Sequence, residues 1–397
     1  MRNGCGSRPA KPSGIHVSTN SAAFLQPVHQ IAANITILEL PLKPIESLGH
    51  GSFGLVRKVE STSNGEILAC KEIRWNYDKE KLEAVRKEIG THRRLSHQHI
   101  TSVVGSYTVG NSFYGILIQP DADDDLGAYL EQVANNPTLD NIDTLTCSFG
   151  CLASGLSYLH ERKVKHKDIK PANILIHQGS VLLTDFGLST DFSDTGQSTS
   201  SGPTGFSREW AAPETLELDS PRNTSANIFS LGCVFVETFT VLAGYSLQDF
   251  RDFRRATGDT SFSTNITNTI TWITKISKSL GDHRREFLAT VKSMLSADPQ
   301  ERPRAKTVWF VASYPPSDEK SDFNMLCGPC CRCLHGMPGY PLPPGSLDED
   351  EEGPRKKGRV RKLLGKILTG GQNGDREVLD EGLVRVESIP SRLIMRG

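Results

Sequence analysis

The sequence predicts an α+β fold with a β-rich first part and a larger helical second part. Strand patterns come first: residues 45–60 alternate apolar and polar side chains around a glycine cluster, and residues 113–120 form a short apolar run. Helix patterns follow, because apolar residues between positions 145 and 159 recur at intervals of four and three, on one helix face. The 397 residues exceed the usual domain length of about 100 to 200, so we expect two lobes or one domain with tails.

Composition excludes several classes of protein. The formal net charge of -1 gives no global attraction to nucleic acid, so no nucleic-acid partner is expected. The most apolar stretch, residues 231–245, is interrupted by Glu237 and threonines, which favours a buried helix over a membrane span. The N-terminal residues lack the apolar stretch of a secretory signal. We therefore expect a cytoplasmic or nuclear protein whose nine cysteines are mostly free thiols.

A glycine-rich segment lies between the first two predicted strands. It reads Gly-His-Gly-Ser-Phe-Gly-Leu-Val from Gly49 to Val56 and fits the pattern G-x-G-x-x-G-x-V. Glycines let backbone amides approach phosphate oxygens, because no Cβ stands in the way. A lone match is more often an ordinary hairpin, so the prediction of a phosphate-binding loop depends on the residues that follow.

Lys71 ends the apolar strand at 67–70, so we expect its ammonium group to project into a cleft. Such a lysine can pair with phosphates when a carboxylate holds it in place. Apolar residues from Leu82 to Leu95 mark one face of a helix, and Glu88 lies beside that face. The alternative for Glu88 is a solvated side chain on a surface helix.

Polar side chains are concentrated in residues 166–187, around a predicted β-hairpin of two apolar runs joined by a turn. Asp168, Lys170 and Asn173 precede the hairpin and Asp185 follows it, so these groups should face a common space. Mg²⁺ prefers oxygen ligands and usually completes its shell with phosphates. We predict Asn173 and Asp185 as metal ligands, Asp168 as the group that orients a hydroxyl, and Lys170 as a counter-charge. The alternative is a polar turn between buried strands.

The order His-Lys-Asp-Ile-Lys-Pro-Ala-Asn at 166–173, followed by Asp-Phe-Gly at 185–187, resembles the catalytic and magnesium loops of eukaryotic protein kinases. Lys170, two residues after Asp168, is similar to the serine/threonine branch of that family. Ala-Pro-Glu at 212–214 resembles the end of an activation segment.

Further positions follow from this resemblance alone. It implies that Ser207 takes the place of the threonine that docks near Asp168. It also implies an ion pair between Arg302 and Glu214, and Ile118 at the gatekeeper position.

The resemblance covers residues 42–313 and implies a bilobal protein kinase fold, with an N-lobe at 42–118 and a C-lobe at 119–313. It implies an ATP-dependent serine/threonine protein kinase that uses ATP and Mg²⁺ and acts on a protein substrate. The implied catalytic residues are Asp168, Lys170, Lys71 and Glu88, and the implied metal ligands are Asn173 and Asp185. The implied nucleotide-binding residues are Gly49, Gly51, Ser52, Phe53, Gly54, Val56, Ala69, Lys71, Gln119 and Leu175.

Two residues depart from the family pattern. Lys167 replaces the arginine of the usual H-R-D, and a lysine lacks the bidentate fork with which arginine holds a phosphorylated loop. Asn227 replaces the aspartate of a D-x-x-S-L-G pattern and loses its charge. These departures keep an alternative open, a pseudokinase that serves as a nucleotide-binding scaffold or interaction module.

Both ends of the chain are predicted to be disordered, residues 1–41 as a polar leader and residues 314–397 as a tail. The tail carries a cysteine cluster, for which palmitoylation and metal binding are both open. Metal binding is the less favoured of the two, because no second cluster of cysteines or paired histidines follows. The cluster consists of Cys327, Cys330, Cys331 and Cys333.

A basic segment with apolar residues at helical spacing, 355–368, follows the cysteine cluster. Such a helix would suit an anionic membrane or a calmodulin-like partner and would give peripheral membrane association. The alternatives are a solvated tail and a nuclear-import signal.

Overall fold

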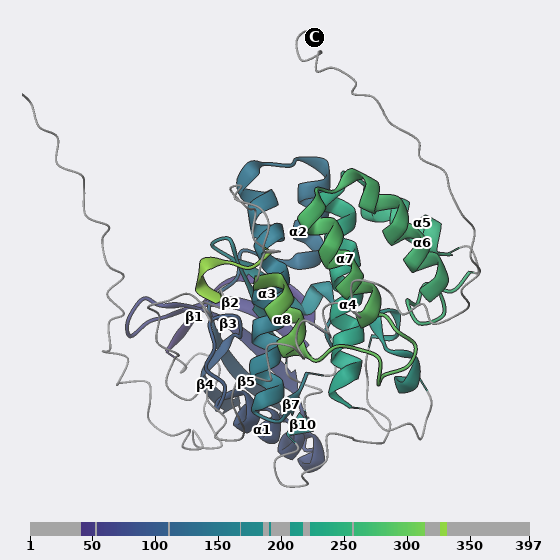
Figure 1. Cartoon of the computed structure of the whole chain (residues 1–397). Helices are drawn as coiled ribbons and strands as arrows, with labels where there is room; N and C mark the ends of the chain where they lie inside the picture. The colour runs from purple at the N-terminus through teal and green to yellow at the C-terminus, as the bar shows by residue number, and fades with distance from the viewer. Residues whose placement is uncertain are drawn as a thin grey trace, which may run out of the picture. The chain divides into compact units, whose positions relative to one another are not determined.

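The computed structural model describes residues 41–51, 54–109, 112–166, 168–185, 190–191, 207–216, 223–255, 258–313 and 326–331. Within these residues the fold has the two parts that the sequence predicts: an antiparallel sheet with one helix, followed by a larger helical part (Figure 1). The prediction of a bilobal α+β kinase fold is therefore confirmed.

The N-lobe is a five-stranded sheet in the order β1-β2-β3-β5-β4, and all neighbouring strands are antiparallel. One helix packs against it, because Leu82, Val85 and Ile89 bury their side chains beside Ile73 and Ile116 of the sheet. The elements are β1 (Leu42–Gly51), β2 (Gly54–Ser61), β3 (Ile67–Arg74), α1 (Lys79–His92), β4 (Ser102–Val109) and β5 (Phe113–Gln119).

The C-lobe is built around two long helices, α3 and α4, whose aromatic side chains stack in its core. Phe149 of α3 lies 4.2 Å from Phe239 of α4, measured between ring centroids, and 5.7 Å from Phe287 of α7. The helices are α2 (Leu126–Asn135), α3 (Leu139–Glu161), α4 (Thr224–Leu242), α5 (Leu247–Arg254), α6 (Ile266–Ile276), α7 (Asp282–Met294) and α8 (Ala305–Ser313).

Helix α4 is long and apolar enough to cross a membrane, but 78% of its apolar stretch is buried inside the protein. The prediction of a buried helix in this region is confirmed. Its first turn begins at Asn223, whose side chain accepts a hydrogen bond from the Ser225 amide and so caps the helix.

The predicted hairpin is formed by β8 (Ile174–His177) and β9 (Ser180–Leu183), which pair antiparallel. The residues before β4 run along β9: the Leu183 amide donates to the His99 carbonyl (2.9 Å) and the Thr101 amide donates to the Leu183 carbonyl (3.0 Å). The residues that lead into β4 of the N-lobe are thus hydrogen-bonded to the β8–β9 hairpin, which precedes Asp185. The remaining short strands are β6 (Asp124–Asp125), β7 (Val164–Lys165) and β10 (Thr190–Asp191).

The prediction that residues 314–397 are disordered is wrong for residues 326–331. Leu326 and Cys327 are fully buried, and residues Pro329–Cys331 form a short 3₁₀ turn, η8. The Gly150 amide of α3 donates to the Leu326 carbonyl (2.7 Å). Local sequence missed this order, because the partners of the segment lie about 180 residues earlier in the chain.

Asn227 lies buried beside the 166–173 segment, where its Oδ1 accepts hydrogen bonds from the His166 amide (3.3 Å) and from His160 Nε2 (3.2 Å). The neutral oxygen therefore keeps one backbone contact to the loop. Burial lowers the pKa of His160 to about 4, so this ring is neutral at physiological pH and donates through Nε2.

The predicted pair of Arg302 and Glu214 is present, with Nη1 and Nη2 at 2.7 and 2.8 Å from the two carboxylate oxygens. The Arg302 side chain is 0% exposed and that of Glu214 is 12% exposed.

We predict that Arg302→Met lowers the free energy of unfolding by about 3–5 kcal/mol, because it leaves a buried carboxylate unpaired. Urea unfolding measures this loss. Lys306→Met is the control, since its pair with Glu161 is exposed and should be worth at most about 1 kcal/mol. Equal losses in both variants would contradict the prediction.

Asn227→Asp should stabilise the catalytic loop by about 1 kcal/mol, because a charged acceptor strengthens the two hydrogen bonds. Thermal unfolding at pH 8 tests this. The control is Asn223→Asp, since aspartate caps a helix as well as asparagine does. A lower melting temperature for Asn227→Asp than for the wild type would show that the neutral amide is required there.

His160→Gln should change the pH dependence of stability. The folded-state pKa of His160, about 4, lies below the unfolded value of about 6.5, so the unfolded state binds the extra proton between these values. Wild-type stability is therefore lost through this group as the pH falls from 6.5 towards 4. Relative to the wild type, the variant should gain about 2 kcal/mol at pH 5 compared with pH 8. Chemical unfolding of both proteins at both pH values measures this difference. An equal difference in unfolding free energy between variant and wild type at pH 5 and pH 8 would contradict the low folded-state pKa of His160.

Candidate active site

The catalytic-loop carboxylate of Asp168 is held by three hydrogen-bond donors. Its Oδ2 lies 2.9 Å from Lys170 Nζ and 2.9 Å from Asn173 Nδ2, and its Oδ1 accepts from the Ser207 amide at 3.0 Å. Lys170 Nζ also donates to the Ser207 hydroxyl at 2.6 Å. The structure thus brings Ser207, at the end of the activation segment, beside the residues of the 166–173 motif, as the resemblance implies.

The surroundings of Asp168 favour its ionised form. Burial raises the pKa of this carboxyl, but hydrogen bonds from Lys170 and from the Ser207 amide outweigh burial and lower it. Asp168 is therefore a carboxylate at neutral pH. A carboxylate only accepts hydrogen bonds, so it can receive the proton of a hydroxyl group.

Lys71 contacts Asp185 more closely than it contacts Glu88. Its Nζ lies 2.6 Å from Asp185 Oδ1 and 4.0 Å from Glu88 Oε1. Burial raises the pKa of Glu88 to about 7, although the Lys71 charge lowers it. The expected Lys71–Glu88 pair is thus at the limit of an ion pair, because the aspartate that precedes Phe186 competes for the same ammonium group. Local sequence pointed to Glu88 and missed this competitor, which lies 114 residues after Lys71.

Asn173 and Asp185 meet the chemical requirement for a Mg²⁺ site, since both offer hard oxygen ligands. His166 fixes the segment before Asp185, because its Nε2 donates to the Thr184 carbonyl at 2.8 Å. The Thr184 amide in turn donates to the Asn173 carbonyl at 3.1 Å. Asp185 itself has a φ of 60°, in the left-handed region that is uncommon outside glycine and concentrated at functional sites.

The glycine-rich segment forms the β1–β2 turn, in which Gly49 pairs with Val56 and Gly51 pairs with Gly54. Gly49 has a φ of 136°, a conformation that other residues rarely adopt, and a Cβ added there would meet nothing within 4 Å. At Gly54 a Cβ would lie 2.0 Å from the Glu72 carbonyl oxygen, so this glycine is required for packing on β3. Ser52 and Phe53 lie outside the described residues.

Two of the predicted walls of the adenine site, Val56 and Ala69, lie on the neighbouring strands β2 and β3. Ala69 of β3 pairs with Ile118 of β5, and Lys71 pairs with Val56 of β2. Leu175 lies in β8, in the C-lobe. The side chain of Gln119 donates a hydrogen bond to Glu66. This bond holds the side chain, so a nucleotide contact at Gln119 would be made by its backbone. A cavity of about 10 Å³ lies behind Ile118, lined by Lys71, Glu88, Ile89, His92, Val103, Ile116, Ile118 and Asp185.

A second small cavity, of about 30 Å³, lies beside Asp168 on the side of Ser207 and Ala212. Its wall is anchored by Trp210, whose Nε1 donates to Glu237 Oε2 at 3.0 Å. Burial raises the pKa of Glu237 to about 7, although the Trp210 hydrogen bond lowers it.

Several predicted features lie outside the described residues. These include Lys167 and the hydroxyl-rich part of the activation segment at 192–206. Cys333 and the basic segment after it also belong to this group.

The chain is similar in sequence to known proteins. Residues 42–310 match the family described as protein kinase domain. The chain is 31% identical over 230 residues to a serine/threonine-protein kinase of Candida albicans, a match that covers 51% of this chain and 30% of that protein. It is 33% identical over 218 residues to the mitogen-activated protein kinase kinase kinase YODA of Arabidopsis thaliana, covering 50% of this chain and 22% of that protein.

A third relative is a probable serine/threonine-protein kinase of Dictyostelium discoideum, 30% identical over 281 residues, which covers 66% of this chain and 49% of that protein. The chain thus spans half or less of the length of these relatives. The family match nevertheless covers more than half of the chain and includes every site residue described above. The chain therefore belongs to the eukaryotic protein kinase family, of the serine/threonine type.

Proposed function

We propose that this protein is an ATP-dependent serine/threonine kinase, in a domain at residues 42–313, which transfers the γ-phosphoryl group of ATP to a hydroxyl of a protein substrate. One observation carries the proposal: the Asp168 carboxylate is held between Lys170, Asn173 and the Ser207 amide. This arrangement combines a hydroxyl acceptor, a cation and a hard oxygen ligand within one hydrogen-bonded unit.

The residues of the chain act mainly by positioning and by electrostatics. Asp168 accepts the hydrogen bond of the attacking hydroxyl and takes its proton as the oxygen attacks. Lys170 lies 2.9 Å from Asp168 and balances charge that develops on the transferred group. Lys71 would bind phosphate oxygens, and Glu88, whose Oε1 lies 4.0 Å from its Nζ, is the carboxylate that would hold it in place. The β1–β2 turn at Gly49 and Gly51 offers backbone amides to the phosphates.

Asn173 and Asp185 would hold Mg²⁺, which neutralises phosphate charge when it is bound. The adenine would lie among Val56, Ala69 and Leu175 and bond to backbone near Gln119. These roles rest on the positions of the residues in the family pattern and on the chemistry of their side chains.

A pseudokinase scaffold is the alternative. Pseudokinases usually lack one or more of the phosphate and metal residues. Here Lys71, Glu88, Asp168, Asn173 and Asp185 are all present. No observation on the structure or on the relatives favours the scaffold.

The substrate is a hydroxyl group of another protein, and no motif in this chain identifies the sequence around that hydroxyl. The relatives are named as serine/threonine kinases or as a mitogen-activated protein kinase kinase kinase, which supports action on another protein. We infer a cytoplasmic or nuclear location from the likeness to these kinases. Attachment of the basic segment at 355–368 to an anionic membrane or to a calmodulin-like partner stays a prediction.

Asp168→Asn should lower kcat by about 10²- to 10⁴-fold while ATP binding survives, because a neutral amide cannot take the hydroxyl proton. Asp185→Asn should abolish the Mg²⁺-dependent part of ATP binding. Transfer of radiolabelled phosphate to a generic basic protein measures activity, and calorimetry with and without Mg²⁺ measures binding.

The control is Asp252→Asn, which changes an exposed carboxylate on α5 that accepts a hydrogen bond from Gln248. Its activity should equal that of the wild type. Wild-type activity in Asp168→Asn or Asp185→Asn would reject the assignment. Binding of ATP by the wild type without any transfer would support the scaffold.

A further inference from the structure

Residues 326–331, the segment after α8 that the structure describes, pack against α3, as the yellow-green ribbon in Figure 1 shows. Besides the bond from Gly150 to Leu326, two side chains hold the backbone of the segment. Trp309 Nε1 of α8 donates to the Cys331 carbonyl (2.7 Å), and Gln98 Nε2 donates to the Cys330 carbonyl (2.7 Å). A Cβ on Gly150 would lie 2.4 Å from Cys327 Cβ, so this glycine is what lets the segment approach the helix.

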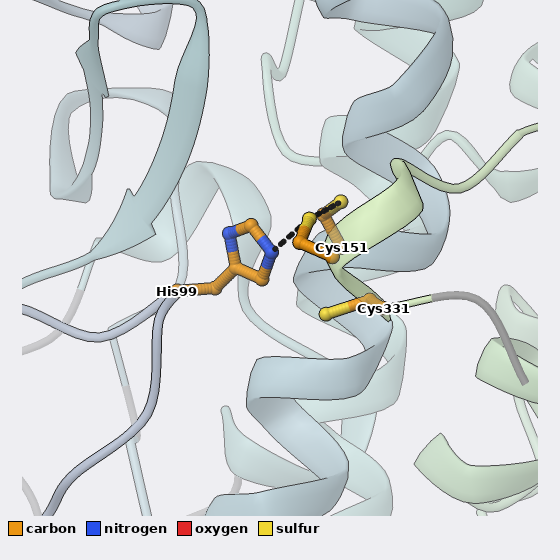
Figure 2. A group of neighbouring side chains, drawn as sticks. His99, Cys151 and Cys331 are labelled. Carbon is orange, nitrogen blue, oxygen red and sulfur yellow. Dashed lines mark hydrogen bonds between the residues drawn. The ribbon is translucent and has the colours of Figure 1, made fainter. Parts of the chain in front are cut away.

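This packing gathers three sulfur atoms and one imidazole nitrogen from distant parts of the chain. His99 precedes β4, Cys151 lies in α3, and Cys330 and Cys331 belong to η8. Their ligand atoms all lie within 4.8 Å of one another. Figure 2 shows the His99 ring turned towards the sulfur atoms, with Cys151 and Cys331 beside it.

The distances within this His99–Cys151–Cys330–Cys331 cluster suit a tetrahedral ion. Cys151 Sγ lies 3.8 Å from Cys330 Sγ, and Cys330 Sγ lies 3.4 Å from His99 Nε2. A tetrahedron with Zn–S bonds of about 2.3 Å has sulfur–sulfur edges of about 3.8 Å. Three thiolates and one imidazole form a soft ligand set, which favours zinc over Mg²⁺ or Ca²⁺.

Groups around the cluster orient its ligands as they do in metal sites. His99 Nδ1 donates to the Val181 carbonyl (2.7 Å), which leaves Nε2 with its lone pair directed at the sulfurs. The Gly328 amide donates to Cys151 Sγ (3.3 Å), and Gln98 Nε2 donates to Cys331 Sγ (3.0 Å). Such donors stabilise thiolate charge. Cys330 is exposed beside a cavity of about 360 Å³, which gives an ion a route of entry.

We propose that His99, Cys151, Cys330 and Cys331 form a structural Zn²⁺ site that fastens the segment after α8 to the kinase domain. This site reverses the preference drawn from sequence, which discounted metal binding because no second ligand pair follows the cysteine cluster. The missing ligands precede it by 179 and 231 residues. The zinc proposal is independent of the proposed kinase activity.

Two other chemistries fit less of the geometry. A Cys151–Cys330 disulfide would need the sulfurs at about 2.05 Å instead of 3.8 Å, and it would leave Cys331 and the oriented imidazole without a role. Palmitoylation needs an accessible thiol, and of Cys327, Cys330 and Cys331 only Cys330 is exposed. An acyl chain on Cys330 would leave Cys151, Cys331 and the oriented imidazole without a role.

The site would tie together three regions of the protein. His99 is bonded through its carbonyl and its ring to β9, the strand that ends two residues before Asp185. Cys151 belongs to α3, and the two remaining cysteines belong to the C-terminal segment. Zinc would therefore restrain the junction between β4 and β9 as well as the segment itself.

Metal analysis of the full-length protein, purified anaerobically with a phosphine reductant, tests the proposal. We expect stoichiometric zinc in the wild type and at least a tenfold lower content in Cys151→Ser and in Cys330→Ser. Cys330 is exposed, so its variant should fold even if Cys151→Ser does not, and circular dichroism checks this. Cys147→Ser is the matched control, since Cys147 lies one turn before Cys151 on α3 but outside the group of four. It should keep its zinc.

Cobalt substitution and thermal unfolding give two further readouts. Cobalt-loaded wild type should show the intense visible bands of a tetrahedral site and thiolate charge-transfer bands in the near ultraviolet, and Cys330→Ser should lose both. Chelation should lower the melting temperature of the wild type but not that of Cys330→Ser. Wild-type protein without zinc, before and after incubation with zinc chloride, would overturn the proposal, as would full zinc in Cys330→Ser. A Cys151–Cys330 disulfide found in the reduced preparation would also overturn it.

Discussion

The pairing of residues 99–101 with strand β9 is the contact on which the rest of the structure depends. Two backbone hydrogen bonds, from Leu183 to His99 and from Thr101 to Leu183, join the start of an N-lobe strand to the hairpin of the C-lobe. Buried backbone groups must be paired, so this register is costly to change. The same register places Asp185 two residues after the end of β9 and lets the His99 ring, whose Nδ1 donates to the Val181 carbonyl, face the cysteines.

Each buried carboxylate of the candidate active site depends on a nearby lysine for its charge. Asp168 keeps its charge despite burial because Lys170 and the Ser207 amide bond to it, whereas Glu88, at 4.0 Å from Lys71, has a pKa of about 7. Asp185 takes the closer place beside Lys71. The two carboxylates thus share one ammonium group, and a cation bound by Asp185 would free Lys71 to pair with Glu88.

The region around α3 shows how a kinase fold accommodates an added segment. Gly150 leaves room for Cys327, and the amide of the same glycine bonds to Leu326. Trp309 and Gln98 bond to the segment from other sides. The thiols and the imidazole that meet there belong to His99, Cys151, Cys330 and Cys331, so a metal site can add stability without occupying the groups proposed for catalysis.

Local patterns in the sequence predicted the strands β2, β3 and β5, the β8–β9 hairpin, and the helices α1, α3 and α4, because amphipathic spacing and short motifs depend only on neighbouring residues. The ordered series from Gly49 to Arg302 was sufficient to indicate the family. Tertiary structure alone decided that Lys71 lies closer to Asp185 than to Glu88, and that residues 326–331 are ordered. It also decided that His99 and Cys151 complete the cysteine cluster. These outcomes depend on contacts between residues up to 231 positions apart, and no local period or spacing encodes such distances.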